Sequence, residues 1–170
     1  MTNRTGRAVS LIIVTILAPG VIAGCSKGIS GQAKPNAADL AAHLKEVAEK
    51  KTQEVTTKAC TDFRDGFVQV NLAINDFVDA YNNNNGYGGA GVDTKLSTAV
   101  STIDKWTGTI GTDLVPEVAP DVSGPLNDWK NAATKVRDGF DTRGDVDVVN
   151  AATDDLNAKK GVAQSACGLY

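Results

Sequence analysis

The chain has 170 residues, with 17 basic and 20 acidic side chains and a formal net charge of −3. This balance argues against a nucleic-acid-binding protein, which would present an excess of Lys and Arg to the phosphates. Apolar residues make up 42% and charged residues 22% of the sequence, which is typical of a globular domain rather than a disordered chain. The length predicts one domain. With a single His and three Cys, a His-rich metal centre is hard to assemble, so we expect neither a metal nor another cofactor.

Residues 1–24 have the order of features found in a secretory signal peptide. Arg4 and Arg7 precede the apolar run 8–22, and Pro19 interrupts that run. A membrane-spanning helix needs about 20 apolar residues, so this run is too short to span a bilayer. We therefore expect residues 1–24 to be removed when the protein is exported.

The signal peptide leads into the tetrapeptide Ile22-Ala23-Gly24-Cys25. This tetrapeptide resembles a bacterial lipobox, in which small residues give signal peptidase access to the bond before a cysteine that receives diacylglycerol. The resemblance implies that Cys25 becomes the first residue of the mature chain and attaches it, through the lipid, to the outer side of the cytoplasmic membrane. The alternative is an ordinary secretory signal followed by an incidental cysteine.

Residues 25–37 are rich in Gly, Ser, Lys and Pro, a composition typical of flexible linkers. From Ser26 to Pro35 they resemble the leader of many mycobacterial and related actinobacterial lipoproteins. We expect them to tether a helical domain at residues 38–170 to the membrane, since two acyl chains give a stable attachment. Without the signal peptide, 15 basic and 20 acidic residues remain, a net charge of −5. Such a domain is expected to stay off anionic lipid headgroups.

Apolar residues after the tether recur at alternating spacings of three and four, with almost no alternation of period two, so the sequence predicts an all-α fold. The clearest stripe runs through residues 63–81, and four Asn and a Gly at 82–86 then favour a turn. Residues 37–51 carry a shorter apolar stripe. They form either a separate leading helix or the start of a long helix that continues through residues 52–59, and the sequence leaves both open.

Three further stripes follow. The second helix is expected to have Asp93 as its N-cap and to be stopped by Pro116 and Pro120, and the third to have Ser123 as its N-cap. The fourth is expected to begin near Asp145 and carries mostly small side chains. Short connections favour antiparallel neighbours, so we predict an up-down-up-down four-helix bundle. The positions of the four stripes are Phe63, Phe67, Val70, Ile74, Phe77 and Tyr81; Leu96, Val100, Ile103, Trp106 or Thr107, Ile110 and Leu114; Leu126, Trp129, Ala133, Val136 and Phe140; and Val149, Ala152, Leu156, Lys160, Ala163 and Cys167.

Two cysteines fit this topology. Cys60 lies at the start of the first main helix, one turn before Phe63, and Cys167 lies at the end of the last helix. In an up-down-up-down bundle these two points are at the same end. Lipidation of Cys25 would leave the other two cysteines as the only thiols in an oxidising compartment. We therefore predict a disulfide between Cys60 and Cys167, and the alternative is two buried, inert thiols.

The sequence contains no convincing catalytic motif. Residues 86–91 have the three spaced glycines of a dinucleotide-binding loop, but a helix precedes them where a strand is required, so we interpret them as a flexible connection. Tyr87 in this connection is a candidate contact residue for a partner. His43 is interpreted as a surface side chain, and the acidic residues in 141–155 lack the ligand spacing of an EF-hand loop. We expect a protein that is not an enzyme.

The expected function is a cell-envelope lipoprotein whose domain faces outward and binds an envelope or surface protein. A second hypothesis is a carrier of a small apolar ligand, because Ala133, Ala152 and Ala163 leave room inside the bundle. Trp106 and Trp129 are expected in the core, or else beside such a ligand. A third hypothesis is a phage or prophage lipoprotein that excludes a second phage, and the sequence does not separate that role from a host role.

Overall fold

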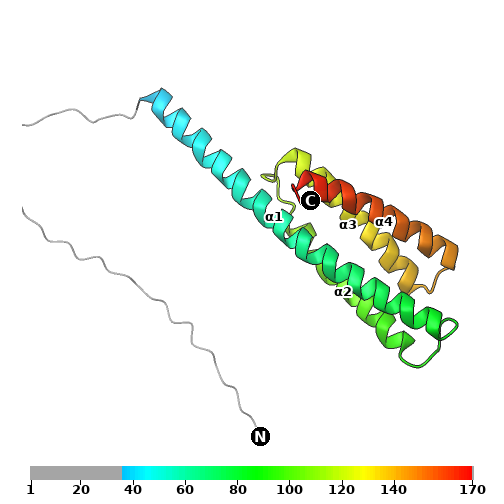
Figure 1. The fold of residues 1–170 in the computed structure, drawn as a ribbon. Helices are drawn as coiled ribbons and strands as arrows, with labels where there is room; N and C mark the ends of the chain where they lie inside the picture. The colour runs from blue at the N-terminus through cyan, green and yellow to red at the C-terminus, as the bar shows by residue number, and fades with distance from the viewer. Residues whose placement is uncertain (1–35, 170) are drawn as a thin grey trace, which may run out of the picture. The chain divides into compact units, whose positions relative to one another are not determined.

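The computed structural model describes residues 36–169, so Cys25, the signal peptide and most of the tether lie outside the described residues. Four helices follow one another: α1 (Ala37–Asn83), α2 (Val92–Asp113), α3 (Pro120–Asp141) and α4 (Val146–Ala166). Successive helices run in opposite directions (Figure 1), which confirms the predicted antiparallel four-helix bundle. None of the described helices is both long and apolar enough to cross a membrane.

α1 is a single helix of 47 residues, which decides between the two arrangements that the sequence allowed. Its first turn is capped by Asn36, whose side chain accepts a hydrogen bond of 3.2 Å from the Ala38 N–H. Residues 37–50 are all exposed, and this part of α1 projects beyond the other three helices (Figure 1). From Val55 onward the helix packs on the core. Tertiary packing thus keeps α1 helical through the Thr-rich stretch where intrinsic propensity is low.

The core consists mainly of the predicted stripes. α1, α2 and α3 each bury five or more residues, whereas α4 buries only Leu156 and Ala163. α1 packs on α2, α2 on α3 and α3 on α4, and the approach between α1 and α4 is much less close. The largest fully buried side chains are Trp129, Phe63, Phe140, Ile103, Ile110, Leu126 and Leu156. The bundle is therefore loosest on the side where its first and last helices face each other.

The predicted disulfide is present and lies on this loose side. Cys60 of α1 and Cys167, just after the last residue of α4, have Cα atoms 5.5 Å apart and are 107 residues apart in the sequence. The bond therefore joins two helices that share little packing surface. Covalent attachment here replaces apolar burial that α4, with its small side chains, does not provide.

Two helices begin earlier than predicted. α2 begins at Val92 rather than after Asp93, and its N-cap is Gly91 with a φ of 81°, a conformation that glycine adopts without steric cost. α3 begins at Pro120, not after Ser123. Proline is favoured in a first turn because its missing N–H would have no partner there. Pro120, which was expected to help end the second helix, therefore starts α3.

Candidate functional site

Four aromatic rings pack together near the C-terminal end of α1, away from the disulfide. The rings of Phe77 and Phe140 meet edge to face with centroids 4.7 Å apart, and those of Tyr81 and Tyr87 with centroids 4.8 Å apart. Tyr87, the candidate contact residue of the loop, also stacks on Phe77 and is half-buried. Phe77 and Phe140 are buried, whereas both tyrosines are partly exposed. The cluster has a buried base and an accessible rim.

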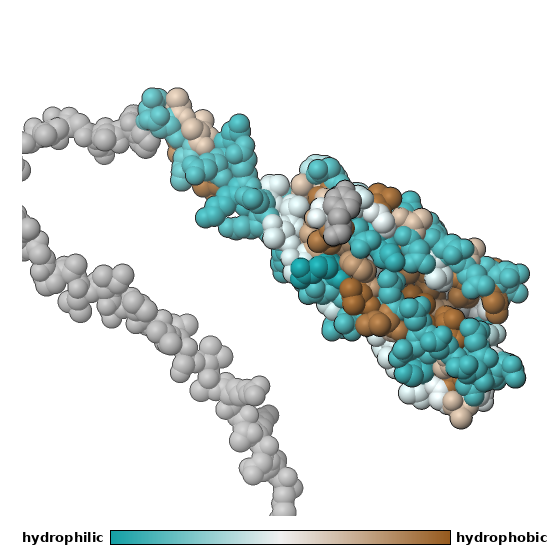
Figure 2. Space-filling model, viewed as in Figure 1, coloured by the Kyte–Doolittle hydropathy of each residue, from teal (hydrophilic) through white to brown (hydrophobic). Residues whose placement is uncertain are grey.

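A pocket of about 200 Å³ lies over these rings, between the last turns of α1 and the first turns of α4. Its opening follows from the loose α1–α4 side described above. Figure 2 shows hydrophobic surface, in brown, between α1 and α4 on the face turned to the viewer. The pocket is lined by Phe77, Val78, Tyr81, Asn82, Tyr87, Phe140, Gly144, Val146, Val149 and Asn150. Apart from its two asparagines, the lining is largely apolar or aromatic.

The half of the bundle that holds this pocket is strongly acidic. An ion pair between Arg137 of α3 and Asp104 of α2, 3.0 Å from nitrogen to oxygen, marks the middle of the bundle. Beyond it, residues 68–103 and 138–151 contain seven acidic and two basic side chains, a net charge of −5. The acidic residues are Asp76, Asp79, Asp93, Asp138, Asp141, Asp145 and Asp147. The potential around the pocket is therefore negative.

Both basic side chains of this half are engaged with carboxylates, and Arg137 at its boundary also pairs with Asp138 and Asp141, at 3.2 and 3.5 Å. Lys95 lies 2.8 Å from Asp76, and Arg143 lies 2.9 Å from Asp93. Arg143 also lies over the ring of Tyr87, 5.4 Å from its centroid. Burial raises the pKa of Tyr87 above its usual 10.0, against the opposing effect of Arg143. The Tyr87 hydroxyl therefore stays protonated near neutral pH.

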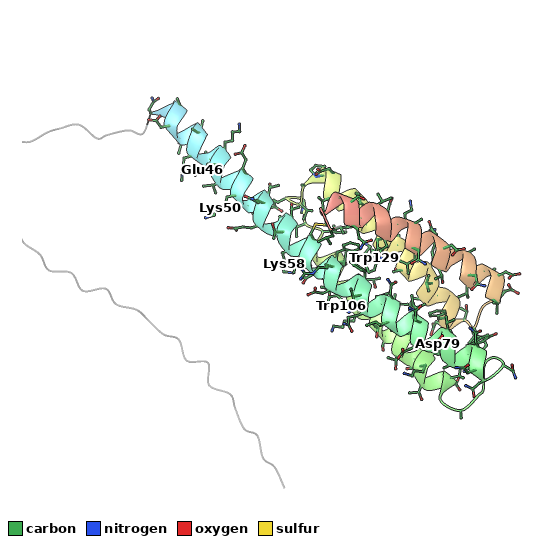
Figure 3. The ribbon with its side chains drawn as sticks, in the orientation of Figure 1. Glu46, Lys50, Lys58, Asp79, Trp106 and Trp129 are labelled. Carbon is green, nitrogen blue, oxygen red and sulfur yellow. A yellow bond between two sulfur atoms is a disulfide. The ribbon has the colours of Figure 1, made fainter. Side chains whose placement is uncertain are left out.

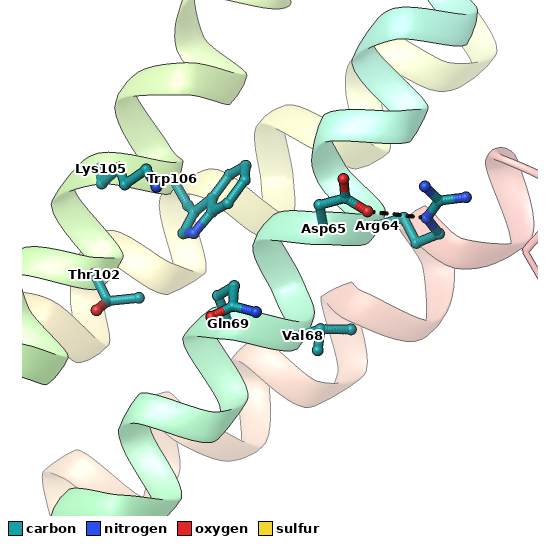
Figure 4. A pocket seen from close by; sticks show the side chains of 7 residues that line it. All are labelled: Arg64, Asp65, Val68, Gln69, Thr102, Lys105 and Trp106. Atoms are coloured by element: carbon teal, nitrogen blue, oxygen red, sulfur yellow. Dashed lines mark hydrogen bonds and ion pairs between the residues drawn. The ribbon is translucent and has the colours of Figure 1, made fainter.

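A second depression lies between α1 and α2 and has a different character. Figure 4 shows Trp106 of α2 standing between Lys105 and the side chains of α1. The Lys105 ammonium is 4.8 Å from the indole centroid, and Arg64 pairs with Asp65 at 3.1 Å on the opposite wall. Trp106 is half-buried and packs against the edge of the core, so of the two tryptophans only Trp129 lies inside it. The depression has a volume of about 550 Å³ and is lined mainly by charged and polar residues.

The position of Trp106 depends on Gly66 of α1. A Cβ atom added to Gly66 would lie 2.9 Å from Cε3 of the indole and within 3.3 Å of two more of its carbons. We expect Gly66→Ala to lower the free energy of unfolding by about 1–2 kcal/mol, because the overlap outweighs the better helix propensity of Ala. Urea unfolding measures the change.

The matched control is Gly108→Ala, in α2, where an added Cβ meets nothing within 4 Å. This variant is expected to gain about 0.5–1 kcal/mol. A Trp106→Ala background should remove the penalty at Gly66, which a double-mutant cycle would show. If Gly66→Ala and Gly108→Ala stabilise the protein equally, the indole is not held over α1 as described.

Most of the chain matches one known protein family. Residues 41–168 match the family described as "Rv2240c four-helix bundle domain". The chain belongs to this family. The matched range contains Cys60, Cys167 and every residue that lines the two depressions. No curated protein and no solved structure matches the chain.

A cluster of three charged side chains at the other end of the bundle has a structural role. Lys58 of α1 pairs with Asp62, one turn away at 2.7 Å, and with Asp113 at the end of α2. Burial raises the pKa of Asp113, whose side chain is 7% exposed, while the hydrogen bond from Lys58 lowers the pKa of Asp62. The group fixes the end of α2 to α1.

The remaining predicted sites fall outside the two depressions. His43 is exposed on the projecting part of α1. Ala133 and Ala163 are fully buried, and with Ala152 they line neither depression. Among residues 36–169, no three His, Cys, Asp or Glu side chains gather in a way that could hold a metal ion.

Sequence reasoning singled out Tyr87 but missed the rest of the pocket. The signal was a group of valines at the start of α4, of which Val146 is 48% and Val148 is 64% exposed. The apolar spacing placed only Val149 in the fourth stripe. Val146 and Val149 become part of a candidate site only once the fold places them beside Val78 and Tyr81 of α1.

Proposed function

We propose that the chain is a bacterial cell-envelope lipoprotein, anchored by diacylglycerol on Cys25, whose helical bundle faces outward and binds a protein partner without catalysing a reaction. The lipobox-like residues Ile22-Ala23-Gly24-Cys25 support the anchor. The bundle and its surface pocket support a binding role.

The disulfide is the observation that carries the proposal. Disulfides persist in exported proteins and are rare in the reducing cytosol, so a Cys60–Cys167 bond fits a chain that crosses the membrane. The bond also uses two of the three cysteines and leaves Cys25 for a different role. The signal-peptide-like residues 1–24 and the Cys60–Cys167 bond both fit an oxidising compartment outside the cytosol.

The projecting part of α1 fits a spacer between membrane and bundle. Residues 37–50 form about 14 residues of helix, which corresponds to roughly 21 Å at 1.5 Å per residue. The N-cap at Asn36 and the ion pair between Lys45 and Glu49, 3.7 Å apart, support this stretch without help from the bundle. Figure 3 shows Glu46 and Lys50 on this projecting stretch. A stiff segment after a linker would hold the binding surface away from the lipid headgroups.

The size of the pocket favours a protein partner over the carrier hypothesis. Sites for small molecules usually enclose about 300–1,000 Å³. The pocket between α1 and α4 has about 200 Å³ and opens to the surface. That volume suits part of a larger partner better than a carried ligand. The depression between α1 and α2 is larger, about 550 Å³, but its mainly charged and polar lining does not suit an apolar ligand.

Metabolic labelling with radioactive palmitate in a bacterial host that processes lipoproteins tests the anchor. The full chain is expected to take up the label, and Cys25→Ser is expected to lose it and to leave the membrane fraction. The matched control is the double variant Cys60→Ser/Cys167→Ser, which should keep the label. A labelled Cys25→Ser protein, or an unlabelled wild-type protein, would overturn the proposal.

A further inference from the structure

We propose that the pocket between α1 and α4 receives one apolar side chain from a basic segment of the partner protein. The acidic residues of the same half of the bundle would hold the flanking Lys or Arg side chains. This inference rests on the proposed binding function and names the chemistry of the partner.

The volume and lining of the pocket fit one large side chain. About 200 Å³ is close to the space that a Leu or an aromatic side chain fills, and the base of the pocket is formed by the buried rings of Phe77 and Phe140. Partner proteins gain most of their binding energy where a single large side chain enters a desolvated pocket of this kind. Val78 and Val146, 39% and 48% exposed, extend the apolar surface around the opening.

The rim offers hydrogen-bonding groups for the backbone of the incoming segment. The side chains of Asn82 and Asn150 line the pocket from α1 and α4. Within the described residues, neither amide makes a hydrogen bond from its side chain, so donors and acceptors remain for a partner. The partly exposed hydroxyl of Tyr81 lies on the same rim. A peptide backbone crossing the opening can satisfy these groups.

The charges beside the pocket select a basic partner. Asp79 lies three residues before Asn82 in α1, and Asp147 lies three residues before Asn150 in α4. Residues three apart are neighbours on a helix surface, so each carboxylate stands next to a residue of the lining. Figure 3 labels Asp79 near the end of α1. Neither Asp79 nor Asp147 forms an ion pair with a basic side chain of the described residues. Opposite charge speeds association and suppresses wrong partners, so nucleic acids and anionic lipid surfaces are disfavoured here.

A defined peptide tests this assignment without knowledge of the natural partner. The probe is the capped peptide Lys-Lys-Ala-Leu-Ala-Lys-Lys, titrated into the full, oxidised chain at low ionic strength. We expect methyl NMR signals of Val78, Val146 and Val149 to shift, while Val162, which is exposed further along α4, should not. A peptide with Gly in place of Leu, or with Glu in place of Lys, should bind at least about tenfold more weakly.

Matched variants distinguish the effect of the carboxylates beside the pocket from the effect of the protein's net charge. Asp79→Lys/Asp147→Lys is expected to weaken binding of the probe at least about tenfold, whereas Glu46→Lys/Glu54→Lys, with the same change in net charge, should alter it less than about twofold. Asn150→Trp, which places a large ring at the rim, should also remove the shifts. These Asp and Asn side chains are exposed, so the variants are expected to fold.

Three results would overturn the assignment: no binding, equal binding by the Gly peptide, or shifts that avoid the three pocket valines. None of them depends on lipid. If palmitate labelling fails while the probe binds, the anchor is wrong and the pocket stands. If labelling succeeds while the probe does not bind, only the pocket assignment falls.

Discussion

Replacing both Cys60 and Cys167 with Ser is expected to lower the free energy of unfolding by about 4–5 kcal/mol. The disulfide links residues 107 positions apart, so its removal restores a large amount of conformational freedom to the unfolded chain. A domain of this kind is stable by about 5–15 kcal/mol, so the loss is a large fraction of the total. Urea unfolding of the oxidised wild type and the double variant, followed by circular dichroism, measures it.

The structure also predicts which part of the bundle is destabilised first when the disulfide is removed. α4 buries only Leu156 and Ala163 and approaches α1 less closely than it approaches α3. Without the bond, hydrogen exchange should quicken most in the last turns of α4, near Cys167. Wild-type protein with its disulfide reduced is the control and should match the double variant. A loss below about 1 kcal/mol, or uniform exchange across the bundle, would contradict this role for the bond.

The sequence predicted the bundle and the disulfide because both depend on features that are local or periodic. The apolar spacing in residues 63–81 defines one face of a helix whatever surrounds it. Topology then placed Cys60 and Cys167 at the same end of the bundle, and the structure has them bonded. The continuity of α1 was less accessible, because it depends on packing of Val55 and Ala59 against other helices.

The pocket was not predictable, because it results from the absence of close packing between α1 and α4. Its lining comes from α1, α3, α4 and the loops, and it exists because α1 and α4 do not close on each other. No periodic pattern in the sequence reveals a gap between the first and last helices.

The exposure of Trp106 was not predictable from periodicity either. Its place in the stripe suggested burial, yet the close approach of α2 to Gly66 leaves the indole half-buried between two helices.

The two tryptophans therefore provide a direct test of the packing. Trp129 of α3 is 1% exposed, and its ring meets Phe63 of α1 edge to face with centroids 5.2 Å apart. Trp129→Ala leaves a large cavity in the centre of the bundle and is expected to cost about 3–5 kcal/mol of unfolding free energy. Chemical unfolding measures the loss, and Trp129→Phe, which keeps most of the ring volume, should recover much of it.

Trp106→Ala is the matched control, because it removes the same side chain from a half-exposed position (Figure 3). Its cost is expected to be about 1 kcal/mol, since less surface returns to water and no closed cavity forms. Fluorescence separates the two residues. Trp106→Ala leaves only the buried Trp129, so emission should shift to shorter wavelength, whereas Trp129→Phe leaves the half-exposed indole and shifts it the other way. Equal costs for Trp129→Ala and Trp106→Ala would mean that Trp129 does not occupy the centre of the core.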